Sequence, residues 1–420
     1  MNRYPEKRLG ELIEIKHGFA FEGQYFVDDG SYMLLTPGNF AEIGGFRDRG
    51  GKQKHYEGPV PSEFVLAPGD LLVAMTEQGE GLLGSTAFVP EGKPCLHNQR
   101  LGLIQPRYGA AVDLNFIYYL FNSRLVRAQI RASSSGTKVR HTSPIRIYAV
   151  LAPFPDVPTQ RRIASILRAY DRMIEINRRR IALLGEMARR IFEDAVGSFR
   201  EREEEGTSAA TVVETTLGGD WGDERATSEE PCETRVIRGT DFRRIQSGDF
   251  STAPTRFISE RSIQRRLLRP FDLVVENSIN AKTRNAGTPL LISAGTIEAL
   301  GSSVIATSFC RLFRCTTPEH ALVLFHFMDW MQRNNEMRQF QVVAANGIAN
   351  FQSEHFMKRA VIPLSLDVIE SLGRRLIPFA ATTFQQQTSN LSRQREILLP
   401  RLVSGELSVS AAEQELEAVA

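Results

Sequence analysis

The chain carries the same series of motifs twice, and this internal repetition restricts its fold more than any other feature of the sequence. Residues 34–40 (LLTPGNF) are echoed by residues 236–242 (VIRGTDF), and residues 66–76 (LAPGDLLVAMT) by residues 268–278 (LRPFDLVVENS). Both pairs are 202 positions apart, and unrelated coincidences would not share one spacing. The repetition therefore predicts a duplicated protein with two similar domains and pseudo-two-fold symmetry.

A long helical pattern follows each of the repeated domains, over residues 159–196 and 367–404. Seam residues in both patterns recur at alternating spacings of three and four, which is typical of a helix that packs along a partner helix. Each pattern is closed by a glycine, Gly197 or Gly405, suited to the position after a helix C-terminus. Pro378, near the start of the second pattern, is expected to kink or shorten that helix.

The seam of the first helix contains a polar residue, Asn177, and adding 210 positions places Gln387 in the seam of the second helix. Both residues lie near the midpoint of their helices, so antiparallel pairing would bring them together. A polar layer costs stability but penalises shifted registers. The alternative is that Asn177 is merely tolerated in a loosely packed layer. Forty residues at about 1.5 Å each would make a spacer of roughly 60 Å.

The full seams are as follows. The first helix contributes Ile163, Leu167, Tyr170, Ile174, Asn177, Ile181, Leu184, Ala188 and Ile191, and the second contributes Ile377, Ala380, Phe384, Gln387, Leu391, Gln394 and Leu398.

Together these patterns predict an α+β fold, in which two pseudo-symmetric mixed α/β domains are separated by a long antiparallel coiled coil of two helices. Residues 201–233 are acidic and lack periodicity, which is typical of a linker. The expected segments are a first domain (1–155), a first spacer helix (156–198), an acidic linker with the start of the second repeat (199–233), a second domain (234–364), a second spacer helix (365–405) and a C-terminal tail (406–420).

The composition adds only broad limits. The chain of 420 residues has no apolar run of about 18 residues and begins without the apolar core of a signal peptide, so we expect a cytoplasmic location. Its four cysteines form no Cys-x-x-Cys pair. Cys310 and Cys315 could ligate a metal, but buried small apolar side chains are the favoured interpretation. The net charge of +2 hides local basic segments, so nucleic-acid binding stays open.

The sequence shows no catalytic motif. Gly79-x-Gly81-x-x-Gly84 looks like a dinucleotide fingerprint, but a second strand rather than a helix is expected after Gly84, which favours a hairpin loop. A phosphate-binding Walker pattern and the Asn-Pro-Pro-aromatic motif of amino-methyltransferases are missing. Asp272 and Glu276 share a strand without the lysine of a nuclease site. The seven histidines show no ligand spacing, so we predict neither catalytic residues nor a metal site.

Several of these segments resemble the specificity subunit of type I restriction–modification systems. The resemblance rests on KRLGELIEIKHGFAF (7–21), PGDLLVA (68–74), RPFDLVVENS (269–278), PFPDVPTQRRIASILRAYDRMIEINRRRIALLGEMARRIF (153–192) and LSRQREILLPRLVSGEL (391–407), and it extends over essentially the whole chain. Two departures concern the domain–helix junctions. Thr159 stands where the family usually has glutamate, and the second junction has lost the Pro-x-x-x-Gln pattern, which puts in doubt only the packing of that junction.

The resemblance implies a function for each part of the chain. Two target-recognition domains would each read half of a bipartite site in double-stranded DNA, and the helices would set the gap and dock two modification subunits. Those subunits would bind S-adenosylmethionine and methylate adenine, whereas restriction subunits would use ATP and Mg²⁺. The chain itself would bind no cofactor, would be no enzyme and would not enter a membrane.

The residues expected to contact DNA are polar side chains in loops, because base edges are read by Arg, Lys, Asn and Gln, and phosphates by basic groups. The candidates are Lys52, Lys54, Lys138 and Arg140 in the first domain and Arg238, Arg243, Arg244, Lys282, Arg284, Asn285 and Asn346 in the second. A solvated surface charge is the alternative for any single one. Arg178, Arg179 and Arg180 are interpreted as a docking surface for a modification subunit, or else as a solvated flank of the coiled coil.

Two other classes of function stay open from the sequence. One is a self-contained DNA methyltransferase or nuclease with a diverged site, which the missing motifs disfavour. The other is a coiled-coil scaffold that binds only proteins, which the basic loops of both domains disfavour.

Overall fold

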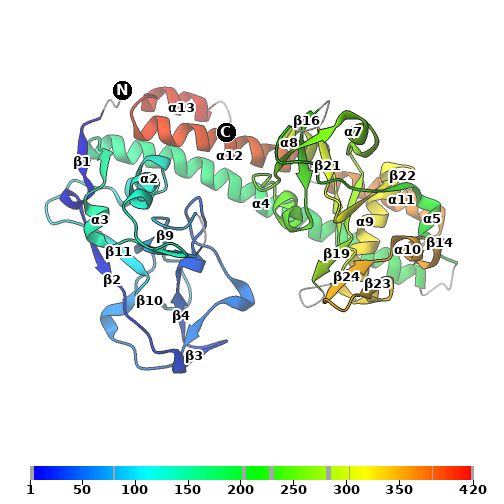
Figure 1. The fold of residues 1–420 in the computed structure, drawn as a ribbon, viewed down its shortest axis with the longest axis horizontal. Coiled ribbons are helices and arrows are strands. Elements are labelled where there is room, and N and C mark those ends of the chain that lie inside the picture. The colour runs from blue at the N-terminus through cyan, green and yellow to red at the C-terminus, as the bar shows by residue number, and fades with distance from the viewer. Residues whose placement is uncertain are drawn as a thin grey trace. The chain divides into compact units, whose positions relative to one another are not determined.

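The computed structural model describes residues 4–78, 81–200, 205–226, 231–280, 285–301, 303–380 and 382–417. The chain divides into two compact units. Unit 1 comprises residues 1–171 and 393–420, and unit 2 comprises residues 172–392. Figure 1 shows mixed helices and strands in each unit. No helix in the described ranges is both long and apolar enough to cross a membrane.

Unit 1 is built from short strands around one antiparallel sheet. The four-stranded sheet has the order β2 (Ile13–His17), β11 (Leu101–Pro106), β7 (Leu71–Ala74) and β9 (Thr86–Phe88). A five-stranded sheet has the order β3 (Phe26–Val27), β5 (His55–Tyr56), β4 (Tyr32–Leu35), β10 (Cys95–His97) and β6 (Val65–Leu66). Two further sheets have two strands each, β12 (Val139–His141) with β8 (Thr76–Gln78) and β1 (Glu6–Arg8) with β13 (Leu151–Pro153). Its helices are α1 (Leu114–Phe121), α2 (Arg124–Ala132), α3 (Pro144–Tyr148) and α13 (Val409–Glu417), with the first part of α4 (Val157–Arg200) and the last part of α12 (Thr382–Val403).

Unit 2 repeats this plan. The four-stranded sheet has the order β15 (Val213–Gly218), β22 (Cys310–Cys315), β18 (Leu273–Glu276) and β20 (Pro289–Leu291). Two sheets have three strands each, in the orders β17 (Thr255–Ser259), β16 (Pro231–Ile237), β21 (Val304–Ala306) and β19 (Ser278–Asn280), β24 (Ile348–Phe351), β23 (Gln341–Val343). A two-stranded sheet joins β14 (Thr207–Ser208) to β25 (Val361–Ile362). Its helices are α5 (Ala209–Val212), α6 (Phe242–Gln246), α7 (Glu260–Arg266), α8 (Ala294–Leu300), α9 (Pro318–Arg333), α10 (Ser353–Arg359) and α11 (Leu366–Leu376), with the remaining parts of α4 and α12.

The strand pairing confirms the predicted duplication. The four-stranded sheet β2–β11–β7–β9 of unit 1 has the same connections as β15–β22–β18–β20 of unit 2. The parallel pair β4–β10 corresponds to the parallel pair β16–β21. The short pairs β1–β13 and β14–β25, both antiparallel, occupy the same place in the two orders.

The second repeat begins inside residues 199–233, the segment predicted to hold an acidic linker and the start of that repeat. The acidic linker is shorter than residues 201–233, because residues 207–218 form β14, α5 and β15. These elements are the counterparts of β1, the first 3-10 turn (Leu9–Glu11) and β2. The individual strands of this segment were not predicted, because its small and acidic residues hide the alternation that a half-buried edge strand normally shows.

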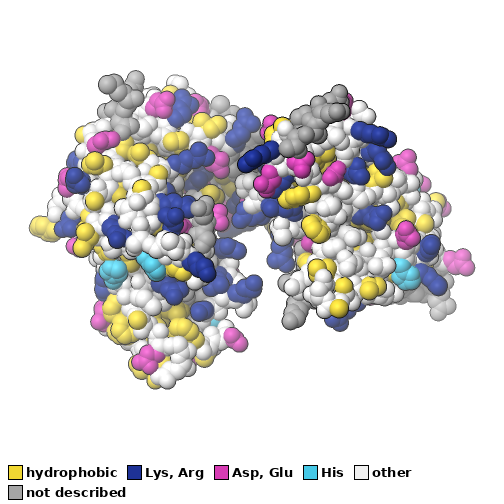
Figure 2. Space-filling view, viewed as in Figure 1, with side chains coloured by type: hydrophobic (Ala, Val, Ile, Leu, Met, Phe, Trp, Pro, Cys, Tyr) yellow, Lys and Arg dark blue, Asp and Glu magenta, His cyan; other side chains and the backbone are white. Residues whose placement is uncertain are grey.

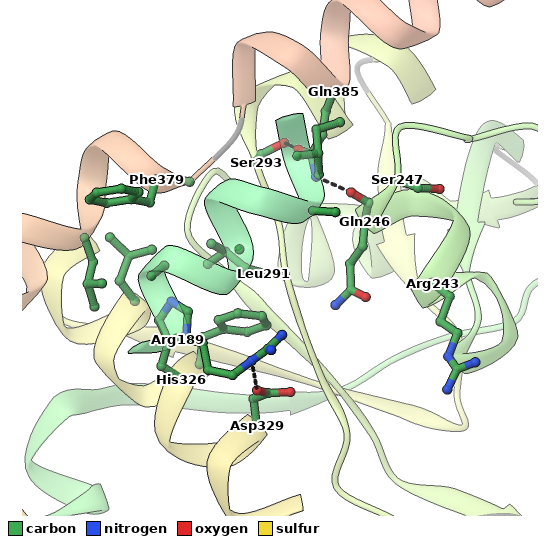
Figure 3. A pocket seen from close by; sticks show the side chains of 18 of the residues that line it. Arg189, Arg243, Gln246, Ser247, Leu291, Ser293, His326, Asp329, Phe379 and Gln385 are labelled. Atoms are coloured by element: carbon green, nitrogen blue, oxygen red, sulfur yellow. Dashed lines mark hydrogen bonds and ion pairs between the residues drawn. The ribbon is translucent and has the colours of Figure 1, made fainter. Parts of the chain in front are cut away.

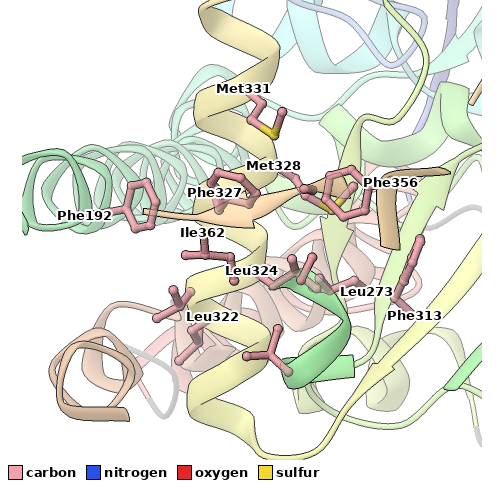
Figure 4. Packing of buried hydrophobic residues seen from close by; sticks show 14 of the residues in the cluster. Phe192, Leu273, Phe313, Leu322, Leu324, Phe327, Met328, Met331, Phe356 and Ile362 are labelled. Carbon is pink, nitrogen blue, oxygen red and sulfur yellow. The ribbon is translucent and has the colours of Figure 1, made fainter. Parts of the chain in front are cut away.

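The predicted seam of the first helix is largely confirmed in α4. Asn177 is buried, as are Ile163, Ile174 and Ile181. Beyond Ala188 the buried residues are Phe192, Val196 and Phe199, which replace the expected Ile191. Gly197 does not close the helix, because α4 continues to Arg200. The C-terminal half of α4 turns this face to the core of unit 2, where Phe192 joins Phe327, Met328 and Phe356 (Figure 4).

The second helix is interrupted near the predicted proline. α11 ends at Leu376, a 3-10 turn spans Ile377–Phe379, and α12 begins at Thr382. The expectation that Ile377, Gln387 and Gln394 lie in the seam is wrong, since all three are exposed. The predicted seam residues Leu391 and Leu398 are buried. The buried residues of α12 are Gln385, Thr388, Leu391, Arg395, Leu398, Leu399, Leu402 and Val403. Gly405 has a φ of 75°, as expected for the residue that follows a helix.

Contacts within each unit show that α4 and α12 pack in opposite directions. In unit 1, Arg395 forms an ion pair with Asp171. In unit 2, the guanidinium of Arg180 lies 5.3 Å from the ring centroid of Phe384. Residue numbers rise along one helix as they fall along the other, so the predicted antiparallel pairing is confirmed. The segment predicted as a tail contains α13, which lies beside α12 and α4 (Figure 1), and Glu413 of α13 pairs with Arg162 at 2.6 Å.

Candidate nucleic-acid interface

In unit 1, the predicted lysines lie on the connection between β4 and β5. Lys52 ends a 3-10 turn (Gly50–Lys52), and both Lys52 and Lys54 are exposed. The Nζ atom of Lys54 lies 5.1 Å from the ring centroid of Phe26, a cation–π contact that leaves its ammonium in water. Both charges are therefore available to a phosphate.

Lys138 and Arg140 belong to a different part of unit 1, the two-stranded ribbon β8–β12. Arg140 faces Glu77 across the ribbon, and its Nη1 donates a hydrogen bond of 3.5 Å to Ser134 Oγ. Lys138 is exposed just before β12. Gln78, which pairs with Val139 at the same end of the ribbon as Lys138, is also exposed. Sequence reasoning missed Gln78, whose only signal was an amide at the end of an apolar strand.

The loop that follows β8 is held by a buried carboxylate. One oxygen of Glu77 accepts hydrogen bonds from the backbone N–H groups of Gly81, Leu82 and Leu83 at 2.9–3.1 Å. Arg127 of α2 donates to the carbonyls of Glu42 and Gly81 beside it. The strand β9 follows Gly84, which confirms the prediction of a strand rather than a phosphate-binding helix there.

In unit 2, the predicted arginines differ in how strongly other side chains bind them. Arg238 is committed to the fold, because its Nε and Nη2 each donate a hydrogen bond of 3.0 Å to the buried carboxylate of Asp241. Arg243 and Arg244 are exposed on α6, and Arg244 lies 3.7 Å from Asp249. The spacing of three between Arg238 and Asp241 was a readable signal for this pair. Arg243 and Arg244 stay the better candidates for DNA contact.

The remaining candidates of unit 2 lie near the sheet β19–β24–β23. Asn285 Nδ2 donates to Asn335 Oδ1 at 3.1 Å, and its Oδ1 accepts from Gln341 at 3.3 Å. Asn346 is exposed in the turn before β24, where its Oδ1 accepts from the N–H of Ile348. Lys282 and Arg284 lie outside the described residues. Among the residues that the structure describes, neither the Asn346 amide nitrogen nor the Lys138 ammonium has a hydrogen-bond partner.

Basic groups are mixed with other side chains on the visible face of each unit. Figure 2 shows Lys and Arg side chains interleaved with acidic and apolar ones on the visible faces. This distribution fits the small net charge. Affinity for a polyanion would then come from several separate contacts.

The predicted docking residues are exposed on α4 but do not share one side of the helix, because Arg178 lines a cavity of unit 2. Arg178, Arg179 and Arg180 are all exposed, Arg179 pairs with Glu175, and Arg180 Nη1 contacts Asn177 Oδ1 at 3.5 Å. Large apolar side chains are exposed along the same helix at spacings of seven and four. These are Ile176, Leu183 and Met187, and Leu183 is 64% exposed. Residues at these spacings form one stripe, which sequence reasoning missed because it followed only the buried seam.

A cavity of about 380 Å³ lies in unit 2 between α4, α6, α9 and the break before α12 (Figure 3). Arg189 and Asp329 lie 3.7 Å apart in its wall, and Gln385 links α12 to Ser293 and to the carbonyl of Gln246. Burial, together with the nearby Arg189 and Arg333 charges, lowers the pKa of His326 to about 4. The imidazole is therefore neutral at physiological pH, and no nucleophile–base pair lines the described wall.

The cysteines behave as apolar residues. Burial raises the pKa of Cys95 to about 11 and, with Asp272, that of Cys315 to about 12. Both thiols stay protonated at neutral pH, which disfavours metal ligation. Among the described residues, no group of three or more His, Cys, Asp or Glu side chains is arranged to hold a metal ion.

Comparisons with known proteins agree with this architecture. Residues 1–186 match the family model of the type I restriction modification DNA specificity domain. The type I restriction enzyme EcoBI specificity subunit of Escherichia coli is 26% identical over 192 residues, which are 45% of this chain and 36% of that protein. The match thus covers about a third of the length of that relative.

Solved structures extend the similarity to the fold of the whole chain. The S subunit of a type I restriction–modification system from M. genitalium aligns over 96% of both chains with a TM-score of 0.54 and 14% identity. The HsdS subunit from Thermoanaerobacter tengcongensis aligns over 96% of this chain and 97% of its own with a TM-score of 0.34 and 15% identity. Residues 1–186 are thus similar to the type I restriction modification DNA specificity domain, and the whole chain shares the fold of the S subunit from M. genitalium.

Proposed function

We propose that this protein is the DNA-specificity subunit of a type I restriction–modification enzyme and reads a bipartite site in double-stranded DNA. The observation that carries the proposal is the duplication, in which two units share their strand connections but differ in their exposed side chains. Equivalent scaffolds with different surfaces suit two half-sites of different sequence. The relative named above is itself a specificity subunit.

Each unit is proposed to bind one half-site through its polar loops. In unit 1 the contacts come from Lys52, Lys54, Lys138 and Arg140. In unit 2 they come from Arg243, Arg244, Asn285 and Asn346, with Lys282 and Arg284 retained from the sequence and Arg238 acting through Asp241 as support. Exposed lysines and arginines supply phosphate contacts, while amides and arginines can read base edges.

The exposed stripe of α4 is proposed to dock a modification subunit. Its apolar residues Ile176, Leu183 and Met187 suit an amphipathic partner helix, and Arg178–Arg180 suit acidic residues on the flank of that helix. S-adenosylmethionine, ATP and Mg²⁺ are assigned to the modification and restriction subunits, and this chain is assigned no catalytic step. Its place of action would be the cytoplasm.

The polar layer of the paired helices is proposed to hold their register. Moving three residues back from Arg180 along α4 and four residues forward from Phe384 along α12 reaches Asn177 and Thr388. Because both side chains are buried, Thr388 is proposed to take the place expected for Gln387. A fixed register would fix the gap between the half-sites.

The main experiment exchanges residues 1–155 for the matching domain of another specificity subunit and co-expresses the hybrid with modification subunits. The methylated motif is then read by methylation-sensitive sequencing. One half-site should change while the other half-site and the gap persist. A change in both half-sites would mean that the units do not read independently. Methyl transfer by the purified chain alone would instead support an enzyme.

The docking surface is tested by placing charge in the apolar stripe. The double variant Leu183→Glu/Met187→Glu should lose co-purification with modification subunits while its melting temperature stays unchanged, because both side chains are exposed. Ile145→Glu in unit 1 is the matched control, since Ile145 is 79% exposed and lies outside the stripe. Normal assembly of the double variant would exclude this surface.

A further inference from the structure

One two-residue turn occupies the same place in both units but presents different side chains. In unit 1 the turn Gln99–Arg100 joins β10 to β11, and in unit 2 the turn Ser308–Phe309 joins β21 to β22. The hydrogen bond that closes each turn is the same, from Leu101 N to Asn98 O and from Cys310 N to Thr307 O, both 2.9 Å long. The two turns are therefore structural equivalents with unrelated sequences.

The backbone of each turn accepts a hydrogen bond from the residue that precedes a neighbouring ribbon. These ribbons are β8–β12 in unit 1 and β19–β24 in unit 2. Met75, just before β8, donates its N–H to the carbonyl of Arg100 at 3.0 Å. Asn277, just before β19, donates in the same way to the carbonyl of Phe309 at 2.8 Å. The turns thus lie directly beside the ribbons that carry Lys138 and Arg140 in unit 1 and Asn346 in unit 2.

A glycine packs against the other side of each turn. Gly18 donates to Leu101 O at 3.3 Å, and Gly219 donates to Cys310 O at 3.1 Å. A Cβ atom on Gly18 would lie 2.2 Å from Asn98 O, and one on Gly219 would lie 2.1 Å from Thr307 O. Only glycine permits such an approach, so both turns are fixed in place by the same backbone packing.

The side chains at the tip of the two turns are exposed. Phe309 is 64% exposed, and Gln99 and Arg100 are also exposed. Within the described residues, the guanidinium of Arg100 has no hydrogen bond or ion pair and the ring of Phe309 has no aromatic partner. A single exposed phenylalanine is ordinary. Here it stands on a rigid turn, next to a ribbon with free polar groups, where its equivalent is a free arginine.

We propose that these turns are base-reading elements, in which Arg100 recognises a guanine of the first half-site and Phe309 contacts the methyl group of a thymine in the second. Arginine donates two hydrogen bonds to guanine O6 and N7, and phenylalanine packs on the thymine methyl group, both in the major groove. A rigid backbone lowers the entropic cost of presenting either side chain. This inference rests on the proposed function and assigns different chemistry to equivalent positions.

The experiment uses the full chain with its modification subunits and begins with the methylated motif. Duplexes are then prepared in which each thymine of the second half-site is replaced by uracil, or each guanine of the first by 7-deazaguanine, one at a time. Binding constants are measured for the wild type, Phe309→Ala and Arg100→Ala. The control is Tyr108→Ala, because Tyr108 is fully exposed beyond the far end of β11, about 20 Å along the strand from the turn.

The wild type and the control should lose about fourfold in affinity at one uracil, which is the contribution of one buried methyl group. Phe309→Ala should show no loss at that position. The wild type and the control should lose about tenfold in affinity at one 7-deazaguanine, whereas Arg100→Ala should bind that duplex as well as the unmodified one. Each variant should alter only its own half-site.

Three results would overturn the inference. A first half-site without guanine, or a second without thymine, excludes the assigned contacts. Unchanged sensitivity of Arg100→Ala and Phe309→Ala to the modified bases shows that the turns do not read them. If the wild-type complex yields no bipartite motif, the proposed function fails as well, whereas a normal motif with indifferent variants removes only this inference.

Discussion

In both units the long helix packs beside the start of an equivalent helix, α1 in unit 1 and α9 in unit 2, but the contacts that hold it there differ. In unit 1 the buried Gln160 of α4 donates to the carbonyls of Ala111 and Pro155 at 3.2 and 2.8 Å and accepts from the N–H of Asp113, the residue before α1, at 2.8 Å. In unit 2, α11 instead packs on the first turn of α9, the counterpart of α1. A Cβ atom on Gly373 would lie 2.5 Å from the Cα atom of Glu319.

The comparison shows what duplication preserves. Strand order and the point where the helix meets the domain are the same, whereas a polar clamp in one unit corresponds to close backbone packing in the other. Backbone pairing constrains a fold more than any particular side chain does, because many side chains can fill a given contact. The differences between equivalent positions are therefore where stability and recognition can be tested.

The largest effect is expected at an aspartate that both units share. Asp272 accepts from Arg269 N and forms a bidentate pair with Arg314 at 2.9 and 2.7 Å, and both partners are largely buried. Asp272→Ala leaves the Arg314 charge unpaired, so unit 2 should lose about 3–5 kcal/mol of stability. Hydrogen exchange of β18 and β22 measures this loss.

The matched variant in unit 1 is Asp70→Ala. Asp70 makes the same turn contact, accepting from Ala67 N at 2.9 Å, but the residue opposite it in β11 is Gln105 rather than arginine. Loss of this single hydrogen bond should cost about 1 kcal/mol. Equal losses in the two units would show that the Arg314 pair adds nothing to stability.

The second effect concerns pH and should affect both units. Burial lowers the pKa of His97 in unit 1 to about 4, and burial with two arginines lowers that of His326 in unit 2 to about 4. The unfolded chain binds these protons near pH 6.5, so each histidine destabilises its unit as the pH falls from about 6.5 to 4, by about 3 kcal/mol. Hydrogen exchange at pH 7 and pH 5 should show the trend.

His326→Phe separates the two contributions. Phenylalanine can stack on Phe192 as the imidazole does, but it does not titrate. Unit 2 should then lose the part of its pH dependence that His326 causes, while unit 1 keeps that of His97. An unchanged pH profile of unit 2 would assign the acid lability to other groups.

The third effect tests the junctions. Gln160→Leu removes three hydrogen bonds and leaves the Asp113 N–H and two carbonyls without that partner, so unit 1 should lose about 2–3 kcal/mol. Unit 2 should keep its stability, because its junction contains no such glutamine. Calorimetry with hydrogen exchange of α1 and α9 distinguishes the units. If the protection of α9 from hydrogen exchange fell as much as that of α1, the two junctions would not be stabilised independently.

Sequence reasoning recovered the features that repeat or keep a period. The spacing of 202 residues identified equivalent strands, and the seam through Ile163, Ile174 and Ile181 identified α4. It failed in the first half of α12, where Gln385 and Thr388 are buried instead of the predicted Phe384 and Gln387. A seam is extrapolated within one continuous helix, whereas a 3-10 turn at Ile377–Phe379 separates α11 from α12.

The candidate interface was less predictable than the fold. Charge and loop position do not reveal that Arg238 forms an ion pair with Asp241. They also do not reveal that Gln99–Arg100 and Ser308–Phe309 are equivalent turns. That equivalence depends on hydrogen bonds between distant strands, such as Met75 to Arg100. Local sequence carries little information about contacts of this kind.

The smallest effect lies in the turn before β7 and β18, where Gly69 and Phe271 are equivalent. Both have positive φ, 87° and 70°, a region that costs a side-chain-bearing residue about 1 kcal/mol or more. Gly69 has open space around its Cβ position, so Gly69→Ala should destabilise unit 1 by about 1 kcal/mol through backbone strain alone. Phe271→Gly should show a smaller net change, because relief of strain opposes loss of the contact between Phe271 and the unit 2 core. Thermal unfolding of the two variants decides the point: a neutral Gly69→Ala would mean that the turn relaxes, and a large loss for Phe271→Gly would mean that packing outweighs backbone strain there.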